Sequence, residues 1–185
     1  MARTGYKTLI MAALFCFTLG VNAEPIRLGA PLPWVKIDNG GEIELHGSQT
    51  STQPWQSTAL VGKSKQLLIH VAGRLSAKQQ LSDVIQHIQR AGLTAEQVHT
   101  TTIVNIDDSL WGSGPFVEQS IIGSKKDQPQ NSFVIDNSGI AAHRWQLLAH
   151  RAAIVVTDAQ GNVQFFHQSP FSPLQVQQLI TLLQN

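Results

Sequence analysis

The sequence predicts a three-layer α/β fold in which helices cover a mixed β-sheet, and three observations indicate this plan. The apolar run from Gln66 to Ala72 is typical of a buried strand, and the helical periodicity after it ends at Gly92. The β-rich segment 99–105 should pair with that strand in parallel. Segments 153–156 and 163–166 predict a β-hairpin, and a last helical periodicity closes the chain.

The turn Gly73-Arg74-Leu75-Ser76 leads from the first of these strands into its helix. Ser76 stands three residues before Gln79, which is the pattern of a capping box, so we expect a helix from Ala77 to Ala91. Its first N–H groups and the cation of Arg74 would then point out of the carboxyl end of a strand. Open α/β sheets usually keep their sites at that edge.

The remaining elements follow from turn signals and short apolar runs. Segments 34–37 and 41–45 predict a hairpin about the turn Asp38–Gly41, and the polar stretch 47–57 predicts a loop. Pro115 fits the first position of a helix that Gly123 would close, with Phe116, Val117 and Ile121 toward the sheet. Segment 133–135 predicts a strand, 141–151 fits either a strand edge or a short helix, and Ser172–Gln175 forms a second capping box.

This order of elements is the thioredoxin-like plan, with an N-terminal hairpin added. The length of 185 residues suits one such domain, expected to span 24–185. Residues 1–23 predict a cleaved signal peptide, because Arg3 and Lys7 precede an apolar stretch that is short for a membrane span and Ala23 ends a small-residue cleavage pattern. An uncleaved anchor is the alternative. We therefore expect a periplasmic protein that is not held in the membrane.

Charge and cysteine content exclude two classes of function. Cleavage after Ala23 would remove two of the 13 basic residues and none of the 12 acidic ones, which leaves 11 against 12 and a net charge of −1. Nucleic-acid binding needs a basic face, so we expect no nucleic acid as a partner. Cleavage would also remove Cys16, the single cysteine, and without a thiol the mature chain cannot exchange disulfides.

Several segments, in the right order, resemble the YtfJ family, a group of small periplasmic proteins of Gram-negative bacteria with a thioredoxin-like, peroxiredoxin-related fold. They are Leu60–Lys63, His70–Arg74, Ser76–Lys78, Thr100–Asn105, Asp107–Asp108, Gly112–Gly114 and Ala153–Val156. The resemblance covers essentially the whole mature chain and implies the fold and the periplasmic location. Thioredoxins carry Cys-x-x-Cys where the first core strand meets its helix, and this chain reads Ala72–Ser76 there. No proline stands at His150–Ala153, where thioredoxins have a cis-proline, so the resemblance does not carry over thiol chemistry.

Two groups of residues are candidates for a binding site at the strand ends. Gly73, Arg74 and Ser76, with Lys78, could bind an anion at the start of the helix, although a capped helix with a solvated or paired Arg74 explains them equally well. Asn105, Asp107 and Asp108 follow the neighbouring strand. They could bind a cation or act as acid and base, but a loop cap with a salt bridge to Arg74 is the more common role of such residues.

The other reactive residue types give weaker signals. The seven histidines show no metal-ligand spacing, so we predict neither a metal site nor another cofactor, and His70 within an apolar strand is typical of a structural histidine. Trp111, before Gly112-Ser113-Gly114, could form an apolar wall or lid, or simply belong to a flexible turn.

The leading hypothesis is a redox-inactive binding module with its pocket between the Gly73–Ser76 turn and the 105–114 loop. The ligand would be a small anion or a segment of a periplasmic partner protein. The alternative is a hydrolase-like enzyme that uses Asp107 or Asp108 with His70. A scaffold that binds proteins through a sheet edge is a third reading.

Overall fold

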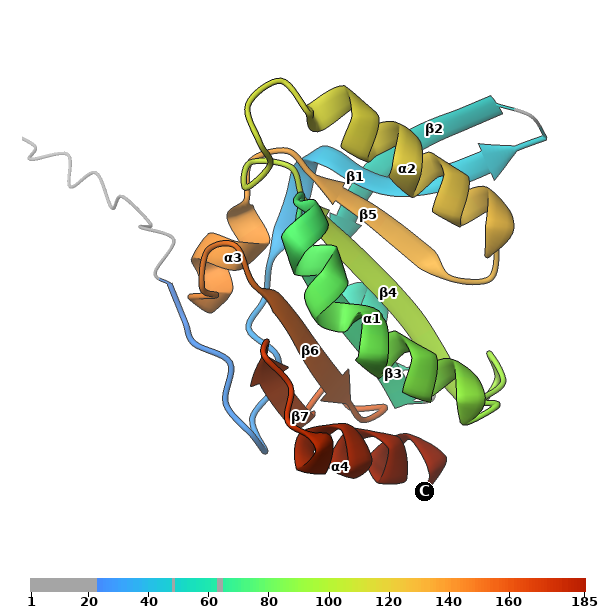
Figure 1. Cartoon of the computed structure of the whole chain (residues 1–185), viewed down its shortest axis with the longest axis vertical. Helices are drawn as coiled ribbons and strands as arrows, with labels where there is room; N and C mark the ends of the chain where they lie inside the picture. The colour runs from blue at the N-terminus through green and yellow to red at the C-terminus, as the bar shows by residue number, and fades with distance from the viewer. Residues whose placement is uncertain (1–22, 48, 63–64) are drawn as a thin grey trace, which may run out of the picture.

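The computed structural model describes residues 23–47, 49–62 and 65–185, which form a seven-stranded mixed sheet with the order β2-β1-β5-β4-β3-β6-β7 (Figure 1). Nearly all of the predicted signal peptide lies outside the described residues. The elements in chain order are β1 (Lys36–His46), β2 (Gln49–Gln56), a 3₁₀ turn (Ser57–Leu60), β3 (Lys65–Ala72), α1 (Leu75–Arg90), β4 (Val98–Asn105), α2 (Gly114–Asp127), β5 (Ser132–Asp136), α3 (Ile140–Trp145), β6 (Ala152–Thr157), β7 (Val163–Gln168) and α4 (Pro173–Gln184).

The centre of the sheet confirms the predicted parallel pairing. β3 lies parallel to β4, with Leu67 opposite Thr100 and Ala72 opposite Asn105, and β5 extends the parallel part beyond β4. β6 pairs antiparallel with β3, and β7 pairs antiparallel with β6 as the predicted terminal hairpin. The carboxyl ends of β3, β4 and β5 therefore meet at one edge of the sheet.

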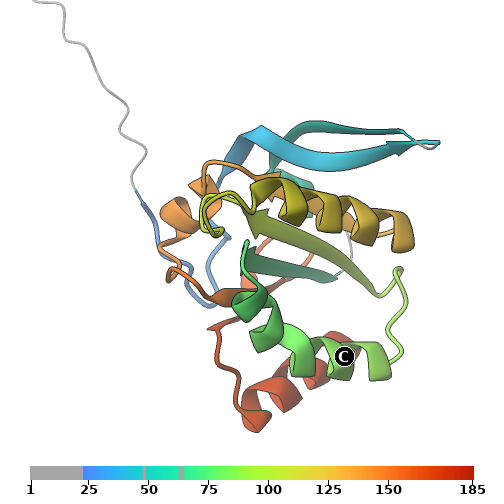
Figure 2. The ribbon, with the colours of Figure 1, turned by 45° about the horizontal axis from the view of Figure 1, so that its top comes forward.

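The two faces of the sheet are covered differently (Figure 2). Helices α1, α2 and α4 lie on one face and enclose an apolar core that includes Leu81, Ile121 and Leu179. The other face is covered by α3, the 3₁₀ turn and the described segment before β1, residues 23–35. The apolar core on this face includes Trp55 and Trp145. Within the described ranges, none of the helices has the length and apolar character needed to cross a membrane.

The predicted hairpin about Asp38–Gly41 is wrong, because β1 runs without a turn from Lys36 to His46. Gly40 and Gly41 form an irregularity within it, with φ of 110° and 99°. A Cβ atom on Gly41 would stand 2.0 Å from the carbonyl oxygen of Gln53, and one on Gly40 would stand 2.2 Å from that of Ile135. The glycines thus allow β1 to approach both neighbouring strands instead of reversing the chain.

The predicted loop at 47–57 is also wrong, since most of it is β2. The side chains of β2 are mainly polar and exposed, and only Trp55 is fully buried. The strand forms because its backbone pairs with β1 from His46 opposite Gln49 to Lys36 opposite Gln56. Tertiary pairing therefore overrides the weak strand preference of this segment.

The helices differ from the prediction mainly at their ends. α1 starts two residues early, at Leu75, so Ser76 lies in its first turn and Arg74 takes the N-cap position without a side-chain bond. α2 continues past Gly123 to Asp127, and Phe116 points to solvent rather than to the sheet. For segment 141–151 we expected either a strand edge or a short helix, and its first residues form part of the short helix α3. In α4 the capping box of Ser172 and Gln175 is confirmed.

Candidate functional site

The β3–α1 turn and the β4–α2 loop pack directly against each other at the carboxyl edge of the sheet. The N–H of Gly73 donates to the carbonyl oxygen of Asn105 at 2.8 Å. A Cβ atom on Gly73 would lie 2.9 Å from that oxygen and 3.1 Å from the Cβ of Ser109. Glycine is therefore required here by close approach, and the turn and the loop touch each other at the point where we predicted a pocket between them.

Asp108 ties three loops together. Nε of Arg74 lies 2.9 Å from both the carbonyl oxygen and Oδ1 of Asp108. The backbone N–H of His150 donates to Oδ2 at 2.5 Å, and Nδ1 of the same histidine lies 2.5 Å from Oδ1. His150 has a φ of 62°, which is unusual for a residue other than glycine. The network thus joins the β3–α1, β4–α2 and α3–β6 connections.

Burial and hydrogen bonding shift the protonation of two groups near this edge. Burial raises the pKa of Asp108, but the bonds from the His150 backbone, the Arg74 guanidinium and the His150 ring outweigh it and hold that pKa below its usual value. His70 is almost fully buried and its Nε2 has no hydrogen-bond partner. Burial lowers the pKa of His70 to about 4, against the opposing charge of Asp108, so its ring is neutral at pH 7.

The predicted site residues are only partly brought together. Asn105 is buried, and its Oδ1 accepts the N–H of Asp108, while Arg74 pairs with Asp108 and not with Asp107, which is exposed. Ser76 and Lys78 are both exposed in the first turn of α1. Trp111 is fully exposed and lines neither of the hollows described below, so it forms no pocket wall.

The hydrolase-like alternative paired Asp107 or Asp108 with His70, and the structure gives Asp108 another histidine as its hydrogen-bond partner. Asp108 bonds to His150, and none of its hydrogen bonds reaches His70. His150 stands 42 residues away along the chain, and we predicted no role for it beyond counting it among the seven histidines. No spacing signal could have found it, because the contact depends on the α3–β6 connection. Within the described part of the chain there is no cluster of three or more His, Cys, Asp or Glu suited to a metal ion.

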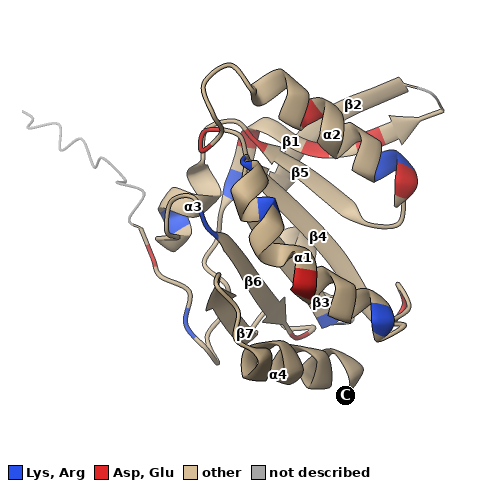
Figure 3. Cartoon of the chain, in the orientation of Figure 1, with Lys and Arg blue, Asp and Glu red and all other residues tan. Residues whose placement is uncertain are grey.

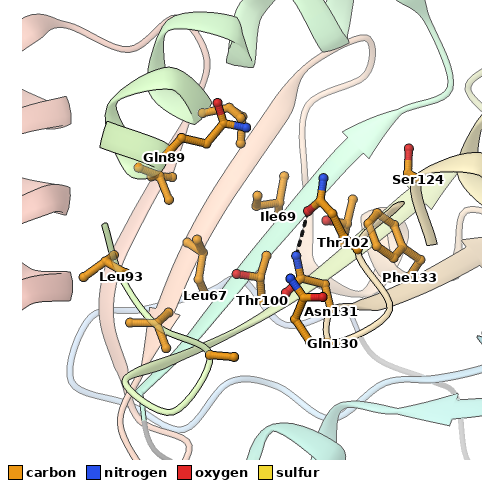
Figure 4. A pocket seen from close by; sticks show the side chains of 15 residues that line it. Leu67, Ile69, Gln89, Leu93, Thr100, Thr102, Ser124, Gln130, Asn131 and Phe133 are labelled. Carbon is orange, nitrogen blue, oxygen red and sulfur yellow. Dashed lines mark hydrogen bonds between the residues drawn. The ribbon is translucent and has the colours of Figure 1, made fainter. Parts of the chain in front are cut away.

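A groove runs between α1 and α2, over the sheet. It consists of two hollows, of about 500 Å³ near the amino ends of the helices and about 350 Å³ near the far end of α1. The two lie next to each other, because five residues line both: Ile69, Ile85, Thr102, Ser124 and Phe133. Figure 4 shows the second hollow, with Leu67 and Thr100 lying between Leu93 and Phe133.

Charge is confined to one end of this groove. Arg74 and Lys78 are the charged members among all residues that line the two hollows, and both belong to the amino end of α1 (Figure 3). The apolar side chains of Leu75 and Phe116 stand at the same end on opposite walls and are 71% and 80% exposed. The far end carries uncharged amides, among which Asn131 donates to Gln128 at 2.8 Å (Figure 4).

Comparison with known proteins then gives the family. The family model described as a bacterial protein of unknown function, YtfJ, matches residues 26–185. The uncharacterized protein YtfJ of Escherichia coli is 40% identical over 174 residues, which cover 93% of this chain and 94% of that protein. An uncharacterized protein of Haemophilus influenzae is 34% identical over 174 residues, covering 92% and 94% of the two chains. The chain belongs to the YtfJ family.

Solved structures confirm the thioredoxin-like fold for this YtfJ-family chain. A reduced 2-Cys peroxiredoxin of Plasmodium vivax superposes with a TM-score of 0.55 at 13% identity, covering 85% of this chain and 96% of that one. A putative thiol:disulfide interchange protein DsbE of Chlorobium tepidum gives 0.55 at 14% identity, covering 85% and 99%. At such low identity these structures show the fold and no activity.

Proposed function

We propose that this YtfJ-family chain is an exported, periplasmic binding module that carries out no thiol chemistry. Export is supported by the basic, apolar and small-residue pattern of residues 1–23. The single cysteine of the sequence, Cys16, lies within that segment. At the start of α1, where thioredoxins carry their cysteines, the chain has Arg74 and Leu75, and Arg74 is held in an ion pair.

The α1–α2 groove is the observation that carries the binding proposal. Its volume falls within the range of about 300–1,000 Å³ that small-molecule sites occupy. It opens to solvent between two exposed apolar side chains, Leu75 and Phe116. Exposed large apolar groups beside a lined hollow are a feature of binding surfaces. The site we favour is therefore the groove and its charged end, instead of the space between the turn and the 105–114 loop.

The Arg74–Asp108 pair argues against a free small anion as the ligand at the turn. The guanidinium is already matched by a carboxylate at 2.9 Å, and Asp107 adds a second negative charge nearby in the chain. An isolated anion would meet little net positive charge there. A ligand that also covers the apolar walls of the groove gains from burial, at about 25 cal/mol per Å² of apolar area.

A thermal-shift panel tests this function. The full-length gene is expressed, and the purified protein is heated with anionic metabolites, short apolar peptides and amphiphiles. A compound at about 100 times its Kd should stabilise the fold by about 2.7 kcal/mol, which corresponds to roughly 5–10 °C for a domain of this size. Ser124→Trp should abolish that shift, because Ser124 lines both hollows and a large ring there fills them.

Gln177→Trp on the exposed face of α4 is the matched control and should leave the shift intact. Circular dichroism of both variants confirms that they fold. The binding function is refuted if no compound in the panel raises the melting temperature of the wild type more than that of Ser124→Trp. Comparing the protein in osmotic-shock and cytoplasmic fractions tests the location.

The Asp108–His150 pair favours a second candidate, a hydrolase-like enzyme. A carboxylate that holds one ring nitrogen of a histidine leaves the other free to take a proton from water, and the His150 side chain is 60% exposed. Hydrolysis of a nitrophenyl ester panel should then depend on His150 and fall in His150→Gln. Equal rates for wild type and His150→Gln, with both proteins folded, would remove this candidate.

A further inference from the structure

We infer that the α1–α2 groove binds a single-chain anionic amphiphile, with its hydrocarbon chain along the groove and its charged head at Lys78. This inference rests on the proposed binding function and names the ligand class of the same site. The ligand is defined by its chemistry: one saturated or nearly saturated chain that ends in a carboxylate or a phosphate. Three features of the groove lead to it.

The first feature is the shape of the groove. The two hollows adjoin, since Ile69, Thr102 and Phe133 line both, and together they follow α1 as one surface channel. The channel begins beside Leu75, at the first residue of α1, and ends beside Leu93, beyond the last. A helix of 16 residues is about 24 Å long, so the channel is long and follows one direction. A long narrow space fits an extended chain better than a compact metabolite.

The second feature is the mainly apolar lining of the larger hollow, whereas the amides of Gln89, Gln128, Gln130 and Asn131 gather around the smaller one. The hydroxyl of Ser82 donates to the carbonyl oxygen of Gln79 at 2.8 Å, and that of Ser124 donates to Ser120 at 3.0 Å. These wall hydroxyls are satisfied within their own helices. An extended peptide would bring a donor and an acceptor from every residue and would leave many of them unpaired, which is unfavourable. A methylene chain brings neither.

The third feature is charge complementarity. Neither hollow is lined by an acidic residue, and the basic ones, Arg74 and Lys78, lie at one end. Arg74 is matched by Asp108, whereas Lys78 is exposed and takes part in no ion pair among the described residues. An anionic head there would complete a pair that the protein itself does not supply. The residues that line the opposite hollow are all uncharged, and the nearby Lys125 donates to the carbonyl oxygens of Pro129 and Asn131, so Lys78 sets the orientation of the ligand.

Calorimetric titration with sodium octanoate, decanoate and dodecanoate, each below its micelle concentration, tests the inference. Each added methylene buried in the groove should tighten binding about fourfold, so Kd should fall about 16-fold from each acid to the next. Lys78→Gln should weaken dodecanoate binding several-fold and leave dodecanol binding unchanged. Lys126→Gln, which removes an exposed cation on α2 outside the lining, is the matched control and should bind both as wild type does.

Ser124→Trp should abolish binding of every chain length, and amide shift changes in a nitrogen-15 spectrum should cluster on α1, β4 and α2. A Kd that does not depend on chain length overturns the inference, as does dodecanoate binding that survives in folded Ser124→Trp. If an apolar peptide from the earlier panel binds in a Ser124-dependent way and dodecanoate does not, the ligand class is wrong and the binding function stands. If no compound binds in a Ser124-dependent way, both the ligand class and the binding function are refuted.

Discussion

His70 should make the stability of this protein fall steeply between pH 6.5 and pH 4. Its ring lies in β3 and is almost fully buried, with Nε2 unpartnered. Burial lowers the pKa of His70 from 6.5 to about 4. Below pH 6.5 the unfolded chain therefore binds a proton that the folded protein does not bind, and the folded state loses stability until pH 4, where it also takes up the proton.

The separation between these two pKa values sets the size of the effect. At about 1.4 kcal/mol per pH unit, the interval from 6.5 to about 4 gives a loss of about 3 kcal/mol from this one residue. That is a large fraction of the 5–15 kcal/mol that stabilises a typical domain. His70→Leu removes the titration, so the loss should disappear in the variant. At pH 7 the variant should be close to wild type, because Nε2 makes no bond that would be lost.

Urea unfolding, followed by the fluorescence of the buried Trp55 and Trp145, measures this difference at pH 7, 6, 5 and 4. The quantity to compare is the free energy of unfolding of wild type minus that of His70→Leu, because the carboxylates titrate in both proteins. His143→Gln, at an exposed position, distinguishes the buried ring from histidines in general. Parallel curves for wild type and His70→Leu across this range would refute the reasoning.

Three further predictions follow from other contacts. Asp108→Asn should lower the free energy of unfolding by about 1–3 kcal/mol at pH 7. This deficit should vanish as the pH falls through the depressed pKa of Asp108, because the carboxyl group of the wild type is then protonated too. Urea unfolding at pH 7 and pH 3 measures the difference. Gly41→Ala should lower the free energy of unfolding by about 3 kcal/mol or more, because its Cβ would stand 2.0 Å from a backbone oxygen. Gly92→Ala, in open space at φ 64°, should lower it by about 1 kcal/mol. Thermal unfolding of both variants separates the effect of close approach from that of backbone strain. Mass spectrometry of the periplasmic protein should find its first residue to be Glu24, and a mass that includes residues 1–23 would contradict cleavage.

The elements that the sequence predicted well are those whose local pattern and tertiary role agree. β3 and β6 are apolar and almost fully buried, β4 is rich in β-branched residues, and α4 carries both a capping box and a periodic apolar face. β2 was missed because its strand character comes from pairing with β1 and not from its own residues. Gly40 and Gly41 looked like a turn because a turn and a close strand approach both require glycine.

The candidate site was predicted in its components but not in its arrangement. The proximity of Arg74 and Asp108 was predicted correctly, because it follows from the parallel pairing of β3 and β4. The partner His150 depends on a left-handed residue in the α3–β6 connection, which no local pattern indicates. The larger hollow is lined by Gly73, Arg74 and Lys78 as predicted but by no residue of the 105–114 loop, because the fit between the two loops depends on distances such as the 2.8 Å between Gly73 and Asn105. Sequence patterns do not contain these distances.

The threonines of β4 are the sequence feature that corresponds to the groove once the fold is known. A strand in the parallel centre of a sheet is normally buried on both faces and apolar throughout. In β4, Ile103 follows that rule on the face toward α3, whereas Thr100 and Thr102 are half-buried on the face toward α1 and α2. α1 packs on β3 and β6, and α2 packs on β5 and β1, so the two helices cover the strands on either side of β4 and leave this face open. Threonine is suited to such a position, since its methyl group can line an apolar channel and its hydroxyl group tolerates water when the channel is empty. Half-buried threonines on the central strand are therefore consistent with the binding groove that we propose, since a ligand would cover this face only part of the time.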